Sequence, residues 1–405
     1  MIAFLLGLPF YILPFIAIIG IVITVHELGH FLAAKAVGTK IDQFSIGFGK
    51  ALFRRTDKSG VEWRLSMIPI GGYVRFAGDD NVASIPDQDD LAAMRADLLE
   101  RVGPAELRRY YHFKPLWQRA MISAAGPAAN FLLSIAIFSI LLGTLGEGIA
   151  TPRIGAVSPG GPAQRAGFQA GDVIVRAAGQ DVMSAEDVRQ LIIMRTGVAV
   201  PFTVKRGGGL VDLVATPQRG PVKDPIGRTQ QLGVIGVRFD PLPGEVRIRH
   251  YSPIEALGGG VKRTANVVTT TVFYLGRMIS GREDASQISG PLGMAHLSGA
   301  LEKQTAENSK DVATFIGNAL LMVLELAASI SVGIGFLNLM PVPVLDGGHL
   351  LFYAYEALAR RPLAAKVQAA GYRVGLALVL GLMLFATWND LQRLHVFNFL
   401  GRLIS

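Results

Sequence analysis

The sequence predicts a polytopic α-helical membrane protein with four spans and one inserted, mostly β domain. Three observations support this fold class. Half of the 405 residues are hydrophobic and only 17% are charged, whereas a soluble globular domain carries about 25% charged residues. Four apolar segments approach or exceed the length of about 20 residues that a transmembrane helix requires. Between the second and third of them lies a glycine-rich stretch with strand-like runs, which is typical of a compact β domain.

The first predicted span covers roughly residues 4–35, and its part from Ala3 to Val25 contains no charge. We interpret it as a retained helix rather than a signal peptide, because no basic region precedes it and no small-residue cleavage site interrupts it. The other predicted spans cover about 121–145, 313–340, which contains Glu325, and 371–388. Trp117 and Trp388 stand at span ends, where tryptophan favours the membrane interface.

Composition excludes several classes of chemistry. The chain has no cysteine, so disulfides, thiolate metal sites and a cysteine nucleophile are excluded, and any metal must use His, Asp or Glu. The net charge is +8, but the Lys and Arg residues are scattered and form no arginine-rich tract. We therefore expect contact with anionic lipid headgroups rather than with nucleic acid.

Basic residues near the span ends predict the orientation of the chain. They cluster between spans one and two and between spans three and four, at Lys35, Arg108, Arg109, Lys114, Arg119, Arg360, Arg361, Lys366 and Arg373. This distribution places both of these connections in the cytoplasm. The glycine-rich domain and both termini are then expected outside it.

Two strand-like runs follow the first span. They read IDQFSIGFGKALF (41–53) and EWRLSMIPIGGYVRFAG (62–78), and they flank the turn-like TDKSG (56–60). This arrangement predicts a β-hairpin. A more acidic stretch from Asp79 to Glu106 is expected to form helix and loop.

A candidate metal site lies at the end of the first span. Residues His26 to His30 read HELGH. Two histidines four residues apart share one helix face, so both imidazoles can reach one Zn²⁺, and Glu27 can take a proton from the attacking water. A chance match on an ordinary helix is the alternative, but ionisable groups next to a long uncharged run are costly and usually functional.

A catalytic zinc needs a third protein ligand and an open position. The candidate is Asp346, at the end of the third span in NLMPVPVLDGGH (338–349), where Pro341 and Pro343 interrupt the helix. His349 is a rival ligand, although its place after two glycines favours a structural role. Asn338 is a candidate hydrogen-bond donor to the substrate backbone or to a developing oxyanion.

These motifs together resemble the site-2 proteases, peptidase family M50, and in particular the bacterial regulator of sigma-E protease type. The resemblance covers nearly the whole chain. The matching segments are HELGH (26–30), FSIGFGK (44–50), IPIGGYVRFAG (68–78), FKPLWQRAMISAAGPAANF (113–131), SGPLGMA (289–295) and NLMPVPVLDGGHLLF (338–352). The combination of HExxH in a first span with NxxPxPxLDG in a later one is highly specific.

The resemblance implies zinc bound by His26, His30 and Asp346, with Glu27 as the general base and Asn338 in contact with the substrate. It also implies that the hairpin of about 44–76 re-enters the membrane and offers an edge strand to the substrate, because a transmembrane helix must unwind before it can be cut. An ordinary cytoplasmic hairpin is the alternative. The substrate-binding residues expected there are Gly47, Gly49, Gly71, Gly72 and Tyr73.

The inserted domain, at about 151–242, resembles a PDZ domain. The resemblance rests on RIGAVSPGGPAQRAGFQAGDVIVRAAGQDV (153–182), with glycines at the tight turns and Asp172 bracing one of them. We place a peptide groove beside Arg153, Ile154, Gly155 and Ala156; a steric module that binds no peptide is the alternative. The family often carries two PDZ domains, whereas this chain has room for one.

The predicted organisation is a first membrane half at 1–145, the PDZ domain at 151–242, a helical segment at 243–311 and a second membrane half at 312–405. The expected activity is zinc-dependent cleavage of single-span membrane proteins in the bacterial inner membrane, with the PDZ domain on the periplasmic side. The family suggests substrates such as anti-sigma factors already trimmed outside. A non-catalytic PDZ-bearing scaffold or chaperone is the alternative, and an ion transporter is a third, although no inverted repeat is visible.

Overall fold

The structure is a computed structural model that describes residues 2–78, 88–223, 229–281, 290–308 and 311–393. Residues 79–87 of the acidic stretch and Ser289 of SGPLGMA lie outside the described residues. The chain divides into two compact units, one of residues 1–138 and 260–405 and the other of residues 139–259. The predicted PDZ domain falls within the second unit.

Four helices of the described chain are long and apolar enough to cross a membrane, over Leu13–Ala36, Leu116–Leu145, Val312–Asn338 and Lys366–Gln392. They overlap the four predicted spans, although the second begins five residues earlier than expected. The helices are α1 (Ile2–Ala36), α2 (Gln88–Leu107), α3 (Leu116–Leu145), α6 (Pro253–Ile279), α7 (Pro291–Asn308), α8 (Val312–Asn338), α9 (Asp346–Ala359) and α10 (Ala365–Arg393), with a short 3₁₀ turn at Tyr111–Phe113.

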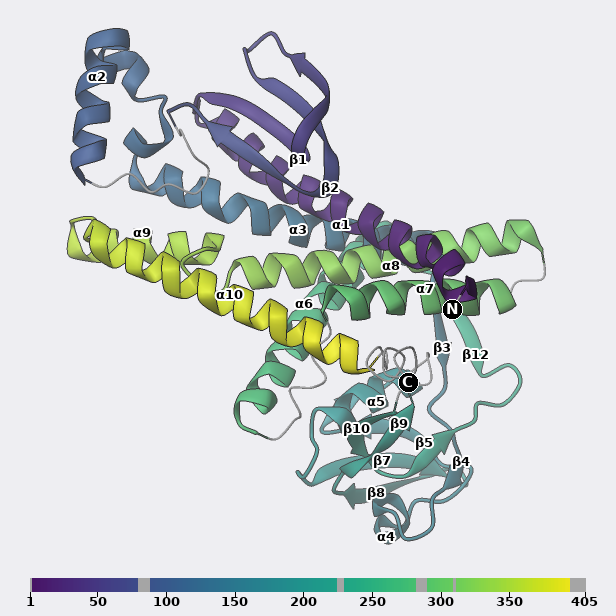
Figure 1. Ribbon diagram of the computed structural model, residues 1–405. Coiled ribbons are helices and arrows are strands. Elements are labelled where there is room, and N and C mark those ends of the chain that lie inside the picture. The colour runs from purple at the N-terminus through teal and green to yellow at the C-terminus, as the bar shows by residue number, and fades with distance from the viewer. Residues whose placement is uncertain (1, 79–87, 224–228, 282–289, 309–310, 394–405) are drawn as a thin grey trace, which may run out of the picture. The chain divides into compact units, whose positions relative to one another are not determined.

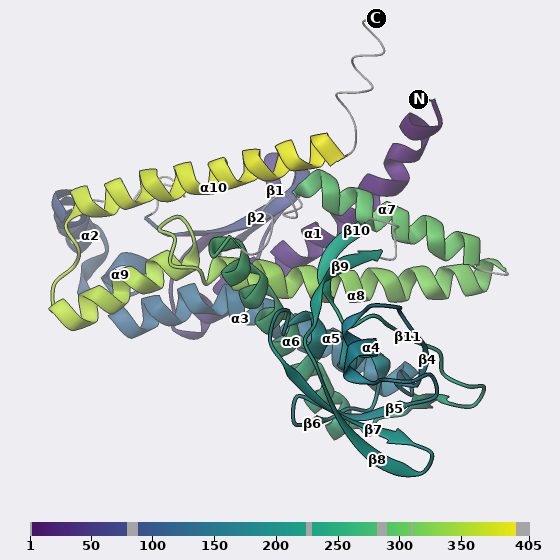
Figure 2. The same ribbon diagram turned by 90° about the horizontal axis from the view of Figure 1, so that it is seen from below.

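Helices α1, α3 and α8 run side by side (Figures 1 and 2). Small residues allow this close approach: a Cβ built on Gly29 of α1 would lie 2.3 Å from the carbonyl oxygen of Ala125 in α3. The hydroxyl of Ser134 in α3 donates to the carbonyl oxygen of Ala328 in α8 at 2.8 Å. Small residues and hydroxyl bonds of this kind hold helices together in membranes, where lipid removes the hydrophobic drive.

The predicted β-hairpin is confirmed as strands β1 (Ile41–Thr56) and β2 (Glu62–Phe76), which pair antiparallel. Its register is more elaborate than a plain hairpin. Residues 43–46 of β1 pair with both 72–75 and 62–65 of β2, so this segment lies in the middle of the folded-over ribbon. Gly47 and Gly49 adopt φ of 85° and 87°, a region that favours glycine, where the ribbon changes register.

Aromatic side chains fix the hairpin to α1. Phe44 is 1% exposed, and its ring lies 5.4 Å from Phe31 of α1 and 4.8 Å from Trp63. Fully burying a side chain of this size contributes about 1.5–3 kcal/mol. At the base of the hairpin, Phe76 stacks on Tyr111 at 4.7 Å between ring centres. The hairpin is therefore held at a fixed place beside the first span.

The second unit is built from short strands and two helices around one apolar core. The strands and helices are β3 (Glu147–Ala150), β4 (Ile154–Val157), α4 (Pro162–Ala166), β5 (Val173–Ala177), β6 (Gln180–Asp181), α5 (Ala185–Ile193), β7 (Val200–Arg206), β8 (Gly209–Ala215), β9 (Gln218–Lys223), β10 (Thr229–Val234), β11 (Val237–Phe239) and β12 (Val246–Arg249). Strands pair in the order β6-β5-β7-β8, with separate pairs β4–β11, β9–β10 and β3–β12. The core includes Ile154, Ile174, Val188, Phe202 and Ile235.

Ion pairs brace the turns of this unit. The Asp172 side chain is 1% exposed and accepts hydrogen bonds from Nε and Nη2 of Arg206, each at 2.7 Å. Burial acts to raise the pKa of Asp172, but the hydrogen bonds from Arg206 and from the Gln169 amide outweigh it and hold that pKa below its ordinary value. The prediction that Asp172 braces a turn agrees with these contacts.

Candidate metal centre

Helix α1 places His26 and His30 on one face, one turn apart. Their Nε2 atoms are 3.2 Å from each other, and the rings meet edge to face with centres 4.8 Å apart. Both side chains are largely buried, at 8% and 12% exposed. The two nitrogens therefore point to one common position, as the four-residue spacing predicts.

Asp346 reaches the same position from a distant part of the chain. Its Oδ2 atom lies 3.1 Å from Nε2 of His26 and 3.5 Å from Nε2 of His30. The three ligand atoms all lie within 4.8 Å of one another. Two imidazole nitrogens and one carboxylate oxygen are a donor set that zinc accepts, and three protein ligands leave a coordination position open.

The local sequence explains how Asp346 arrives there. Helix α8 ends at Asn338 because Pro341 and Pro343 follow, and Asp346 is the first residue of α9. A Cβ built on Gly347 would lie 2.3 Å from the carbonyl oxygen of Leu339, and one on Gly348 equally close to that of Val342. Only glycine therefore lets the start of α9 fold back against the end of α8.

Neighbouring groups orient both imidazoles for metal binding. Nδ1 of His30 lies 2.8 Å from the carbonyl oxygen of Ile122. A carbonyl oxygen can only accept, so Nδ1 carries the proton and the Nε2 lone pair of His30 is free for a metal. A hydrogen bond from the ring nitrogen that does not face the metal fixes the tautomer and the ring orientation of a metal-binding histidine.

Asn130 of α3 takes the same part for His26. Its amide lies 3.2 Å from Nδ1 of His26, and the side chain is fully buried. The Oδ1 atom of Asn130 is buried and has no hydrogen-bond partner among the described residues. With its oxygen toward His26, the Asn130 amide accepts from Nδ1–H, and Nε2 of His26 is then free for a metal. The residues present therefore fit a bound zinc ion.

Gly126 gives the two rings their room. A Cβ built on this residue would lie 2.3 Å from Nε2 of His30 and 2.9 Å from Cε1 of His26. Gly126 and Asn130 lie in AAGPAANF, and neither was predicted to have a role in the site. A small residue and an amide four positions apart on one helix face were the available signal. The carbonyl of Ile122 has no signal, since every residue carries one.

Glu27 lies between the metal-ligand cluster and the hairpin. A Cβ built on Gly72 would be 3.2 Å from Cγ of Glu27, so β2 passes directly over this side chain. The Val74 backbone amide also lies near the Glu27 carboxylate. Farther along the same strand, the carbonyl oxygen of Pro69 approaches Gly20. The segment from Pro69 to Val74 therefore follows α1 toward the cluster.

The five hairpin residues expected to bind substrate are not equally placed. Gly72 contacts Glu27, whereas Gly71, with φ of 129°, packs against the ring of Phe48. The Tyr73 hydroxyl lies 2.6 Å from the Gln43 amide. Gly47 and Gly49 stand at the register change of β1. Of these residues, Gly72 is the one that touches a group of the candidate site.

The two remaining candidates from the NLMPVPVLDGGH segment are separated by the structure. His349 is not among the three residues whose ligand atoms come together; its Nε2 lies 2.9 Å from the Tyr372 hydroxyl, and burial lowers the pKa of His349. This placement agrees with the preference for Asp346 over His349. Asn338 is the half-buried last residue of α8.

The residues proposed for a peptide groove lie in and next to β4. Arg153 and Ile154 hydrogen-bond on both sides, to Asp240 and β11 on one and to residues 171–173 on the other. These bonds occupy the backbone of Arg153 and Ile154. Among the described strands, β4 and β11 form a two-stranded pair, so each has one partner strand.

Known proteins give a consistent picture of this arrangement. The signature of Peptidase family M50 matches residues 14–382. "Metalloprotease MmpA" of Caulobacter vibrioides is 44% identical over 99% of this chain and 100% of its own length. A protein of Agrobacterium fabrum named as a putative zinc metalloprotease is 42% identical over 95% of this chain and 96% of its own.

One solved structure is similar to part of the chain. The PDZ domain of an SdrC-like protein from Listeria monocytogenes is 20% identical, covers 22% of this chain and 84% of that domain, and superposes with a TM-score of 0.18. The family assignment depends on the full-length matches, which span the helices carrying His26, His30 and Asp346. With four apolar helices, the chain is a multi-pass membrane protein, and it belongs to Peptidase family M50, a family of zinc-dependent metalloproteases.

Proposed function

We propose that this zinc intramembrane protease cuts single-span membrane proteins, with substrates of the anti-sigma-factor type that another protease has already trimmed outside. One observation carries the catalytic part of the proposal: His26, His30 and Asp346 place three ligand atoms around one position, although Asp346 lies 320 positions after His26 in the sequence. A metal bound there would stand beside Glu27.

In the proposed mechanism, Nε2 of His26, Nε2 of His30 and an oxygen of Asp346 would hold the zinc. When bound, zinc polarises the scissile carbonyl and makes water acidic enough to attack near neutral pH. Glu27 accepts the proton of that water and returns it to the leaving amine. Asn130 and the Ile122 carbonyl keep both imidazoles in the required tautomer.

The hairpin would hold the substrate in an extended form. A transmembrane helix protects its peptide bonds by internal hydrogen bonding, so the segment to be cut must unwind. The Pro69–Val74 segment runs along α1 toward Glu27, and strand addition at this part of β2 would align a peptide with the metal. We assign Asn338 a polar contact to the same peptide and Gly72 the space for its backbone.

We infer that the hairpin lies at membrane depth. Several of its apolar side chains are exposed: Phe48 45%, Leu52 67%, Phe53 60%, Leu65 45%, Met67 60% and Ile68 47%. A run of such residues would be unfavourable in water but is expected in lipid. The basic connections described above favour the bacterial inner membrane, with the β-rich unit on the periplasmic side.

The β-rich unit would limit or recruit substrates there. A PDZ groove binds a peptide beside an open strand edge and a helix. The groove proposed beside Arg153, Ile154, Gly155 and Ala156 lies along β4, which pairs with β11. The Arg189 guanidinium of α5 lies 5.7 Å from the ring centre of Phe239 in β11, so we also assign β11 and α5 to this groove.

The test compares wild type with Glu27→Gln. The variant keeps the three metal ligands, so it should bind zinc normally while membrane proteins accumulate uncut in cells. Asp346→Asn should instead lose zinc and activity together, and Asp97→Asn, an exposed acidic change in α2, should alter neither. Normal cleavage by Glu27→Gln would overturn the catalytic proposal and favour a scaffold or chaperone role.

A further inference from the structure

Helix α8 carries one ionisable residue, Glu325, midway between its ends at Val312 and Asn338. At 1.5 Å per residue, the carboxyl group is about 20 Å from either end of this span. It is thus at the depth where an acidic side chain is most costly. Ionisable residues at this depth usually serve a function and have a partner.

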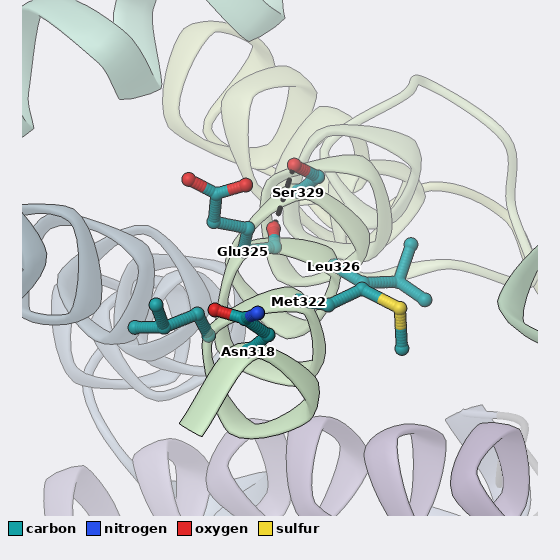
Figure 3. Close-up of a pocket in the computed structure, with 6 residues that line it drawn as sticks. Asn318, Met322, Glu325, Leu326 and Ser329 are labelled. Carbon is teal, nitrogen blue, oxygen red and sulfur yellow. Dashed lines mark hydrogen bonds between the residues drawn. The ribbon is translucent and has the colours of Figure 1, made fainter. Parts of the chain in front are cut away.

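The face of α8 around Glu325 is hollow rather than packed. A hollow of about 460 Å³ is lined by Asn318, Leu321, Met322, Glu325, Leu326 and Ser329 (Figure 3). Three of these, Asn318, Glu325 and Ser329, are polar and recur at helical spacing, so they form a polar stripe on one face. Figure 3 shows the Glu325 side chain extending away from Met322 and Leu326.

The polar stripe, defined as Asn318, Glu325 and Ser329, does not satisfy its own carboxyl group. The Ser329 hydroxyl donates to the backbone carbonyl of Glu325 at 2.9 Å. Within the described residues, no hydrogen bond or ion pair of the Glu325 carboxyl is found. Other faces of α8 are occupied, because Ala328 and Ser331 bond to α3 and Ala327 packs on α1.

The chain's own spans cannot supply a cation at this depth. In the four apolar helices, the Lys and Arg residues are Lys35, Arg119, Lys366 and Arg373. Two of these lie within four residues of a helix end, Lys366 begins its helix, and Arg373 is two turns from that beginning. A second copy brings the same spans and would oppose one carboxyl group to another. Among the described residues of the four apolar helices no complementary group lies at this depth, which favours a different membrane polypeptide as its source.

We propose that the polar stripe docks the transmembrane helix of a substrate that carries a lysine or arginine near the middle of its span. The inference rests on the proposed function, because it names the substrate class of that site. Helix α8 leads from Glu325 to Asn338 and the turn before Asp346, so a helix seated on the stripe lies along the element that approaches the metal ligands. The charge of Glu325 and the space beside it fit such a side chain.

The test measures capture rather than cleavage. A photoreactive amino acid replaces Leu321 in the Glu27→Gln enzyme, in membranes, with model single-span proteins that differ in one central residue. We expect the span with a central lysine to be captured about 5- to 10-fold more than the same span with leucine, the ratio that one interhelical polar contact supplies. A lysine moved to the end of the span should lose this advantage.

Variants of the stripe decide the assignment. Glu325→Gln should abolish the preference, and Glu325→Lys should transfer it to a span with a central glutamate. Leu320→Gln, at a residue 57% exposed on the same helix, should leave the preference unchanged. Equal capture of lysine and leucine spans, or a preference that survives Glu325→Gln, would overturn the inference.

The outcome is separable from that of the proposed function. If the wild-type enzyme cuts the leucine span and Glu325 variants alter neither capture nor cutting, the protease stands and the docking stripe falls. If lysine spans are captured through Glu325 but the wild type cuts none of them, the stripe stands and the proposed substrate cleavage falls.

Discussion

Replacement of Asn130 by alanine should weaken zinc binding without unfolding the protein. Asn130 is fully buried, and its amide is the group that holds Nδ1 of His26 in the structure. Loss of such a support typically costs 10- to 100-fold in metal affinity, which is about 1.4–2.8 kcal/mol. The expected result for Asn130→Ala is therefore a zinc dissociation constant raised by about 10- to 100-fold.

Competition with a zinc chelator on purified protein in detergent measures this constant directly. Asn130→Asp keeps an oxygen toward His26 and should bind zinc nearly as tightly as wild type. Ser134→Ala is the matched control, because Ser134 lies one turn away, is equally buried and bonds only to backbone carbonyls. If Asn130→Ala binds zinc as wild type does, or if Ser134→Ala weakens binding as much, Asn130 does not support zinc binding through His26.

Four further predictions concern the candidate metal site and the ion pairs of the β-rich unit. Gly126→Ala should lose zinc and activity because its Cβ would strike an imidazole. Gly143→Ala on the same helix should keep both, because its Cβ would lie at an ordinary 3.5 Å from its nearest neighbour. Equal behaviour of the two variants would refute the steric argument. Removal of zinc by a chelator should stop cleavage, and added zinc should restore it; activity that persists in metal-free protein would contradict the mechanism. Arg206→Leu should destabilise the β-rich unit by about 3 kcal/mol because it leaves the buried Asp172 carboxylate unpaired, and an unchanged melting temperature of that unit would count against this. The Arg153 guanidinium lowers the pKa of Glu245 to about 2, so this group's stabilisation is full above pH 4.5 and is lost as the pH falls toward 2; hydrogen exchange of residues 237–249 should rise over that window in wild type but not in Glu245→Gln.

Local patterns predicted the parts of the site that local physics determines. The spacing of His26 and His30 follows from helical geometry alone, and the structure places both nitrogens on one position. The break after Asn338 follows from two prolines that cannot continue a helix. The hairpin was readable because turn residues separate two strand-like runs.

Contacts between segments that are distant in the sequence could not be predicted in detail from the sequence. The pairing of Asp346 with the two histidines was expected from the sequence by its chemistry and by resemblance, but its distance could not be derived from either motif. The Ile122 carbonyl and the clearance over Gly126 depend on how closely α1 and α3 approach. That approach is set by matched small residues on two helices, and one sequence does not reveal which faces meet.

The sequence pattern predicted both strands of the hairpin but not their full pairing. Alternation predicted two strands, and both are present, but residues 43–46 of β1 pair with two separate parts of β2. Glycines with positive φ at 47 and 49 allow this folding-over. The peptide groove beside Arg153, Ile154, Gly155 and Ala156 stays a prediction, and hydrogen bonds on both sides of Ile154 occupy the backbone at one end of it.

The placement of Glu27 links these observations. Glu27 directly follows a metal ligand on α1, and its side chain lies against Gly72 of β2. A group that must receive a proton from water and pass it to a leaving amine needs to face both the metal and the bound peptide. An acidic residue elsewhere on α1 would meet the hairpin or the metal but not both. The position of Glu27 directly after His26 is therefore important because β2 packs against this side chain. Loss of the β2 contact should impair proton transfer even when the three metal ligands are intact.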